Sequence, residues 1–148
     1  MDRISFLKSI GLTCLCSSAI TSLLQSCTAS MIITGNISGD ELIVALNDFN
    51  PEPDSDKGFR KYIIVHNDLL QFPVCVYRFN DKEYSALWLQ CTHQGNELQV
   101  SGEMLQCPAH GSEFDNKGGV QNGPAEENLR TFPVVIENDH IRISLKAR

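Results

Sequence analysis

The chain has 148 residues, of which 42% are hydrophobic and 20% are charged, and its formal net charge is −6. This length suits a single domain, and this much apolar material excludes an intrinsically disordered chain. The lack of a run of basic residues argues against nucleic acid as a partner.

The first 26 residues have the pattern of an export signal. Arg3 and Lys8 give a basic start, and the stretch Ile10–Leu24 that follows is mostly apolar. A basic start before an apolar region of about 7–15 residues is typical of a signal peptide. A membrane-spanning helix needs about 20 apolar residues, so an uncleaved anchor is the weaker interpretation. We therefore predict a signal peptide at residues 1–26.

The predicted signal ends in Leu24, Gln25 and Ser26, directly before Cys27. This ending resembles the lipobox of bacterial lipoproteins, in which cleavage precedes the cysteine and the cysteine then carries the lipid. Two acyl chains give a stable membrane anchor. We therefore expect a lipid on Cys27, a tether at residues 27–40 and a location on the periplasmic side of the cell membrane. The alternative is an ordinary signal peptidase site that leaves Cys27 as a free thiol.

The rest of the chain reads as short strands joined by turns, with no helix of convincing length. Two antiparallel hairpins are expected, one around Asp81-Lys82 and one around Glu137–Asp139. Near the C-terminus apolar and polar residues alternate, which is typical of a strand with one buried face. The fold class is therefore all-β, a small sandwich or barrel with an inserted glycine-rich segment. The strands are predicted at Glu41–Phe49, Arg60–Asn67, Pro73–Asn80, Glu83–Gln90, 129–138 and 140–146.

Two short boxes carry the chemistry: Cys91-x-His93 and Cys107-x-x-His110. Two cysteines and two histidines can hold a metal, and sulfur and nitrogen donors suit zinc or iron–sulfur chemistry rather than magnesium or calcium. In an oxidising compartment, free neighbouring thiols tend to form a disulfide unless a metal holds them as thiolates. A plain disulfide between Cys91 and Cys107 is the alternative, but it explains neither the histidines nor the glycines.

The spacing of the cysteines and histidines distinguishes a zinc site from an iron–sulfur cluster. Zinc sites favour paired cysteine knuckles, or a cysteine pair followed by a histidine pair. Here each box mixes one cysteine with one histidine, which suits a two-iron centre with both cysteines on one iron and both histidines on the other. A structural zinc domain that binds a partner remains the alternative from another class.

The sequences CTHQG and CPAHGSEFD, which contain these boxes, resemble the Rieske family, whose boxes surround a [2Fe–2S] cluster. The resemblance implies a Rieske-like antiparallel β-fold over residues 41–148, with a cluster-binding subdomain at about 90–127. It also implies one [2Fe–2S] cluster per chain. Cys91 and Cys107 would ligate one iron through sulfur, and His93 and His110 the other through a ring nitrogen.

Residues around the boxes also match the family. Gly95 and Gly111 follow the boxes, where the loops crowd the cluster and require positive φ angles. Gly123-Pro124 matches the family's proline loop, which covers the cluster and keeps water from it. These four residues are therefore expected to shape and tune the cluster site.

The chain departs from respiratory Rieske proteins at four places. Asn96 and Ala109 stand where those proteins have two further cysteines joined by a disulfide. Ser112 keeps a serine that hydrogen-bonds the cluster sulfur, whereas Phe114 replaces a tyrosine with the same role. Gln94 replaces a leucine that enters the quinol pocket, so quinol oxidation is not expected. Since one hydrogen bond to the cluster is lost, we predict a reduction potential between the respiratory type and the four-cysteine ferredoxins.

The resulting functional prediction is a one-electron transfer protein with oxidoreductase activity only alongside a partner. A cytochrome or a catalytic oxidoreductase subunit is the expected redox partner. The alternative is an electron-transfer small subunit of a periplasmic oxidoreductase complex. Outside the boxes, His66 and His140 are expected on the surface, while Cys75 and Trp88 are expected in the core.

Overall fold

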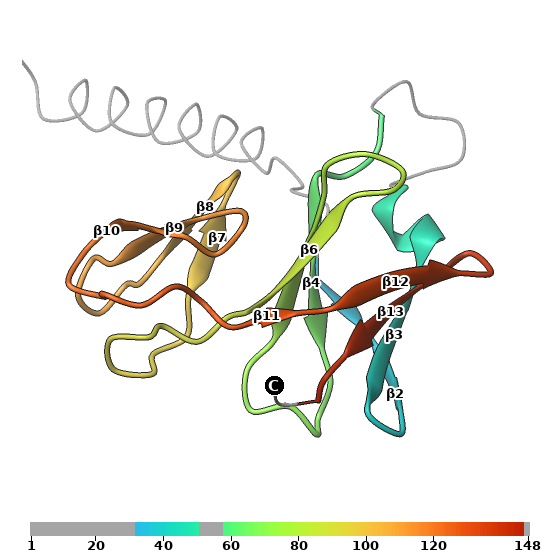
Figure 1. Ribbon diagram of the computed structural model, residues 1–148, viewed down its shortest axis with the longest axis horizontal. Helices are drawn as coiled ribbons and strands as arrows, with labels where there is room; N and C mark the ends of the chain where they lie inside the picture. The colour runs from blue at the N-terminus through green and yellow to red at the C-terminus, as the bar shows by residue number, and fades with distance from the viewer. Residues whose placement is uncertain (1–31, 51–57, 147–148) are drawn as a thin grey trace, which may run out of the picture. The chain divides into compact units, whose positions relative to one another are not determined.

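The computed structural model describes residues 32–50 and 58–146 (Figure 1). The predicted signal peptide and Cys27 lie outside the described residues. Within the described ranges, no helix has both the length and the apolar character needed to cross a membrane.

The described residues form three small sheets, which are nearly all antiparallel. Their orders are β1-β4-β5-β6-β11, β12-β13-β3-β2 and β10-β9-β8-β7, and among these strands only β1 and β4 pair in parallel. The prediction of an all-β chain is confirmed. The strands are β1 (Ile32–Thr34), β2 (Asn36–Ser38), β3 (Glu41–Ala45), β4 (Tyr62–His66), β5 (Val74–Arg78), β6 (Tyr84–Trp88), β7 (Gln99–Ser101), β8 (Met104–Gln106), β9 (Glu113–Asp115), β10 (Val120–Asn122), β11 (Thr131–Phe132), β12 (Val134–Glu137) and β13 (His140–Ser144).

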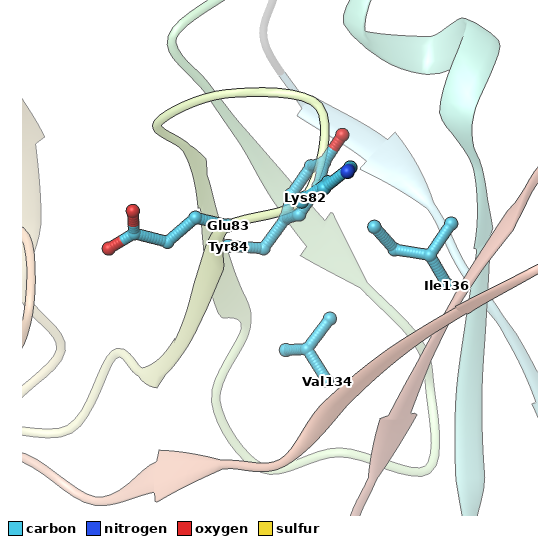
Figure 2. A pocket seen from close by; sticks show the side chains of 5 residues that line it. All are labelled: Lys82, Glu83, Tyr84, Val134 and Ile136. Atoms are coloured by element: carbon cyan, nitrogen blue, oxygen red, sulfur yellow. The ribbon is translucent and has the colours of Figure 1, made fainter.

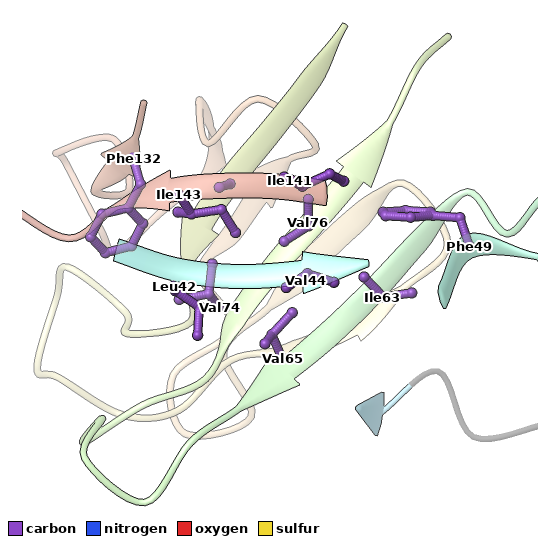
Figure 3. Close-up of a cluster of buried hydrophobic side chains, with 11 residues drawn as sticks. Leu42, Val44, Phe49, Ile63, Val65, Val74, Val76, Phe132, Ile141 and Ile143 are labelled. Atoms are coloured by element: carbon purple, nitrogen blue, oxygen red, sulfur yellow. The ribbon is translucent and has the colours of Figure 1, made fainter. Parts of the chain in front are cut away.

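The first two sheets form a base with a shared core, in which side chains from both sheets face one another (Figure 3). The residues on this face alternate along each strand, as Leu42 and Val44 do on β3. Burying each such side chain contributes roughly 1.5–3 kcal/mol. The fully or nearly fully buried core residues are Leu42, Val44, Phe49, Ile63, Val65, Val74, Val76, Ala86, Phe132, Ile141 and Ile143.

The chain crosses from one base sheet to the other at Gly35, between β1 and β2. A Cβ atom at Gly35 would lie 2.5 Å from Val65 Cγ1 and 2.7 Å from Leu42 Cδ1. Contacts this short would force the buried side chains of Val65 and Leu42 to move, so glycine is the residue that fits here without disturbing the core.

Both predicted hairpins are confirmed. β5 pairs with β6 across the turn at 79–83, and β12 pairs with β13 across Asn138 and Asp139. These two turn residues have φ angles of 48° and 60°, as two-residue hairpins require. Trp88 packs edge-on against Phe132, with ring centroids 5.8 Å apart, which places it at the edge of the base core.

Two predicted boundaries differ from the structure. The predicted strand Glu41–Phe49 is too long, because β3 ends at Ala45 and a 3-10 helix, η2 (Leu46–Phe49), follows. Asp48 accepts a hydrogen bond from the backbone N–H of Ala45 at 3.2 Å, a local bond that competes with strand pairing. The predicted tether is also too long, since β1 and β2 lie within residues 27–40 and pair with the sheets.

The third sheet, β7 to β10, is inserted between β6 and β11, as predicted for a glycine-rich insert (Figure 1). Tyr77 of the base donates a hydrogen bond from its hydroxyl to the carbonyl of Gly102 at 3.0 Å. Ser85 of β6 donates to the carbonyl of Asn116 at 2.6 Å. The insert is therefore tied to the base through two of its turns.

A second buried cluster joins this insert to the base. It contains Leu87 and Leu89 from the base, Leu105 and Phe114 from the insert, and Cys75. Cys75 is fully buried, as predicted, and burial raises the pKa of its thiol. The insert therefore has no independent core, and its packing depends on β5 and β6.

Candidate metal centre

The first cluster loop, residues 91–96, begins three residues after the end of β6. The backbone N–H of Cys91 donates to the carbonyl of Asn96 at 2.8 Å, and the N–H of Gly95 donates to the carbonyl of Cys91 at 2.8 Å. Gly95 has a φ angle of +75°, a conformation that glycine adopts without strain. The loop is thus closed by two bonds that both involve the cysteine backbone.

The second cluster loop, residues 107–112, joins β8 to β9 and repeats this arrangement. The N–H of Cys107 donates to the carbonyl of Ser112 at 2.8 Å, and the N–H of Gly111 donates to the carbonyl of Cys107 at 2.9 Å. Gly111 has a φ angle of +78°. In both loops the glycine comes four residues after the cysteine, and the positive φ expected from the sequence is found at both glycines.

The four box residues come together between the two loops. The rings of His93 and His110 lie with centroids 5.0 Å apart and planes at 89°. Cys91 and Cys107 are each only 2% exposed and are free thiols. His93 is half-buried and His110 is exposed. The structure therefore places two buried sulfurs beneath two neighbouring histidines, one of which reaches the surface.

The surroundings of Cys107 favour a thiolate. Its burial opposes ionisation, but hydrogen bonds from the backbone N–H groups of His110 and Ala109 and from the Cys91 side chain act in the other direction. Together they hold the pKa of the Cys107 thiol below its ordinary value. A thiolate is the form of cysteine that ligates a metal.

His93 supplies a second observation that fits a metal site. Its Nδ1 atom is buried and has no hydrogen-bond partner among the described residues. An unpaired buried polar group costs about 1–3 kcal/mol, so proteins rarely leave one. Coordination of a metal by this nitrogen would satisfy it, and the donor set therefore fits an iron–sulfur group.

Within the described ranges, no three or more His, Cys, Asp or Glu side chains gather around one point as a single-metal site would require. A two-iron cluster needs no such group, because each iron takes only two ligands from the protein.

The proline loop is fastened to both cluster loops. The hydroxyl oxygen of Ser112, which is fully buried, accepts the backbone N–H of Ala125 at 3.0 Å. The hydroxyl of Thr92 donates to the carbonyl of Glu127 at 2.7 Å. Sequence reasoning missed Thr92, although its place between Cys91 and His93 in the CTH motif was a usable signal.

The remaining predicted site residues divide into surface and core. Gln94, Asn96 and Ala109 are exposed on the cluster loops. Because Asn96 and Ala109 are not cysteines, no disulfide joins the loops at these positions. Gly123 and Pro124 are also exposed. Phe114, in contrast, is fully buried and pairs across the sheet with Leu105 and Val120. His66 and His140 lie exposed on the base, away from the loops, as predicted.

The Rieske [2Fe-2S] domain family matches residues 55–133, more than half of the chain. The chain belongs to the Rieske family. Its cofactor is one [2Fe–2S] cluster, and its chemistry is electron transfer, which excludes the structural zinc alternative. Neutral imidazole replaces two thiolates in a Rieske centre, which raises its potential to roughly −150 to +300 mV, from about −400 mV in plant-type ferredoxins.

No curated protein matches the chain. Among solved structures, the plasma membrane Rieske protein PetC3 from Synechocystis PCC 6803 is 28% identical, with coverage of 57% of this chain and 86% of that chain and a TM-score of 0.49. A chain in a complex of reduced oxygenase and oxidized ferredoxin in carbazole 1,9a-dioxygenase is 22% identical. The match covers 75% of this chain and 98% of that chain, with a TM-score of 0.53. The second likeness shows that the Rieske fold is shared.

Proposed function

We propose that this Rieske protein is an exported, lipid-anchored carrier of single electrons on the outer side of a bacterial cytoplasmic membrane. The signal-like residues 1–26 and the lipobox-like ending at Cys27 support export and anchoring. The observation that carries the electron-carrier role is the exposed ring of His110 beside half-buried His93.

Within the site, Cys91 and Cys107 would hold one iron through sulfur, and His93 and His110 the other through a ring nitrogen. The buried cysteines belong to the second buried cluster, which joins the insert to the base, whereas the histidine pair is the part of the site nearest the surface. An electron would therefore enter and leave the protein on the histidine side.

The charge of the chain is concentrated around this site. Residues 91–127 contain six acidic residues but only one basic residue, Lys117, whose ammonium pairs with Glu83 at 3.2 Å. The other described residues contain eight acidic and seven basic residues, so they are nearly neutral. Glu97, Glu126 and Glu127 are exposed, and none forms an ion pair within the part of the chain that the structure describes. A redox partner with a basic docking surface, such as a cytochrome, suits this distribution.

The alternative is an electron-transfer small subunit of a periplasmic oxidoreductase complex. A subunit of this kind would use the same cluster site and the same acidic surface around it, but it requires a stable catalytic partner. Purification from membranes in a gentle detergent separates the two functions. A stoichiometric partner supports the subunit, and an isolated red-brown protein supports the mobile carrier.

Small charged oxidants test the proposed electron exit. The oxidation rate of the reduced protein is measured with cationic tris(1,10-phenanthroline)cobalt(III) and with anionic ferricyanide. The ratio of the first rate to the second should be higher at low salt than at high salt. Replacing Glu97, Glu126 and Glu127 by glutamine should reduce this preference, whereas Asp40→Asn with Glu137→Gln, on the base, should leave it nearly unchanged. Equal effects of the two variants would contradict an exit near His110.

Cell fractionation tests the anchor. The wild-type protein should enter the membrane fraction, and Cys27→Ala should release it or leave it unprocessed, while the visible spectrum of the purified domain stays the same. A Cys27→Ala protein that remains fully membrane-bound after processing would contradict lipid anchoring.

A further inference from the structure

Strand β6 leads from the base into the first cluster loop. At its start, the ring of Tyr84 packs edge-on against Phe49, with ring centroids 5.7 Å apart. Tyr84 also lines a small cavity of about 260 Å³ together with Val134 and Ile136 of β12 (Figure 2). β6 pairs with β5 on one side and with β11 on the other. The strand that precedes Cys91 is therefore firmly fixed in the base.

Trp88, the last residue of β6 and the single tryptophan of the chain, is held on several sides. Its ring lies edge-on against Phe132 and Phe72, with centroids 5.8 Å and 5.9 Å away. Its backbone N–H donates to the carbonyl of Arg130 at 2.9 Å, and the guanidinium carbon of Arg130 lies 6.0 Å from its ring centre. The direction of the indole N–H is therefore set by the base.

The side chain of Gln90 lies between this indole and the first cluster loop. The indole N–H of Trp88 donates to Oε1 of Gln90 at 3.0 Å. An indole nitrogen can only donate, so the oxygen of Gln90 must face Trp88 and its NH₂ group must point elsewhere. That group lies beside the loop, because a Cβ atom on Gly95 would be only 3.2 Å from Gln90 Nε2.

Gln90 also meets the loop through its backbone. It forms an antiparallel bridge with Glu97, directly after the loop ends at Asn96. Gly95, which lies beside the side chain of Gln90, donates its N–H to the carbonyl of Cys91. The backbone of Gln90 therefore holds the two ends of the loop together, and its side chain lies against the turn that closes the loop on Cys91.

The second cluster loop is joined differently. Gln106 directly precedes Cys107, as Gln90 directly precedes Cys91. Its side chain, however, is exposed and donates to Glu113 of β9 at 2.7 Å. The glutamine before the cysteine thus links the first loop to the base, whereas it links the second loop to a strand of its own sheet.

We propose that Gln90 is a positioning residue, which transmits the fixed position of Trp88 to the first cluster loop and so to Cys91 and His93. This proposal rests on the proposed roles of these two residues as cluster ligands. Its consequence is local: without the bond to Trp88, the first loop opens more often, while the second loop keeps its own support from Ser112.

Hydrogen exchange of the cluster-loaded protein, followed by mass spectrometry, tests the proposal. Hydrogen-bonded backbone N–H groups exchange only when the structure around them opens, so their exchange rate reports local stability. Gln90→Leu removes the acceptor of the indole N–H. It should accelerate exchange in peptides that cover residues 91–96 by about two- to tenfold, the factor expected for one lost hydrogen bond. Exchange in peptides that cover residues 107–112 should stay unchanged.

Three further variants locate the cause. Gln90→Glu keeps an oxygen for the indole N–H and should exchange as slowly as the wild type. Gln106→Leu, the same substitution before the second cysteine, should leave the first loop unchanged. Trp88→Phe removes the donor and keeps an aromatic ring, so it should accelerate the first loop more than the second. This variant decides the question in the same way if Gln90→Leu does not fold.

The electron paramagnetic resonance signal of the reduced protein provides a second measurement. Gln90→Leu should broaden this signal, because Cys91 and His93 then occupy a wider range of positions, and Gln106→Leu should not. Equal acceleration of both loops, or of neither, would overturn the proposal, as would Gln90→Glu exchanging as fast as Gln90→Leu. Failure of the carrier role in the oxidant experiment would leave these exchange rates as they are, so the two proposals can fail separately.

Discussion

The two cluster loops, residues 91–96 and 107–112, share a backbone and differ in how they present their histidines. In each, the cysteine N–H bonds to the residue five places on, and the cysteine carbonyl accepts from a positive-φ glycine four places on. His93 comes two residues after its cysteine and is half-buried, whereas His110 comes three residues after and is exposed. A shift of one residue within the same loop thus separates an inner from an outer histidine.

The loops also differ in how they are supported. The second loop is fixed from inside, because Ser112 is fully buried and accepts the N–H of Ala125. The first loop is fixed from outside, through the exposed bond from Thr92 to the Glu127 carbonyl. With Asn96 and Ala109 in place of a disulfide pair, the proline loop is the element that connects them. The internal bond of Ser112 should therefore contribute more to stability than the exposed bond of Thr92.

The largest effect is expected from removing a proposed cluster ligand. Cys107→Ala should abolish cluster binding, because no other thiol lies in the second loop. Cys75→Ala, the same substitution in the shared core, should retain a full cluster, since Cys75 is buried outside the loops. Iron content and visible absorption measure how much cluster each of the two variants binds. A Cys107→Ala protein with full iron content would contradict the site.

Ser112→Ala tests the internal support of the second loop. It leaves the N–H of Ala125 without an acceptor, which should lower the free energy of unfolding by about 1–3 kcal/mol. It also removes the hydroxyl expected to bond the cluster sulfur, so the reduction potential should fall. Chemical denaturation and redox titration measure the two effects. An unchanged stability would show that the proline loop does not depend on Ser112.

The two loop glycines allow a direct comparison. Gly95→Ala and Gly111→Ala should each destabilise the protein by roughly 1–2 kcal/mol, because both have positive φ angles. Gly95→Ala should be the worse, since its Cβ would lie 3.2 Å from Gln90 Nε2, while nothing lies within 4 Å of a Cβ at Gly111. Thermal unfolding of the proteins with bound cluster ranks them. The reverse order would mean that factors other than local sterics dominate.

Thr92→Val tests the external support of the first loop and should have the smallest effect. It removes one exposed hydrogen bond to Glu127 and preserves the shape of the side chain, so about 0.5–1 kcal/mol is expected. Denaturant unfolding, compared with Ser112→Ala under the same conditions, decides the ranking. A loss from Thr92→Val larger than that from Ser112→Ala would reverse the assignment of internal and external support.

Sequence patterns predicted the fold class, both hairpins and the position of the insert, because alternation and turn residues are local signals. They did not predict β1 and β2, since three-residue strands carry too little alternation to be read. The end of β3 was missed because the Asp48 side chain, not hydrophobic pattern, stops the strand. The box residues could be chosen from spacing, but the link from Ser112 to Ala125 joins residues 13 positions apart and depends on tertiary packing.

A redox titration of the purified protein tests the central claim most directly. Histidine ligation on one iron, with Phe114 in place of a hydrogen-bonding tyrosine, predicts a midpoint potential well above the value of about −400 mV for plant-type ferredoxins and below about +250 mV. A midpoint near −400 mV would contradict ligation by His93 and His110. A midpoint at or above about +250 mV, within the high end of the Rieske range, would contradict a cluster retuned by the loss of that hydrogen bond.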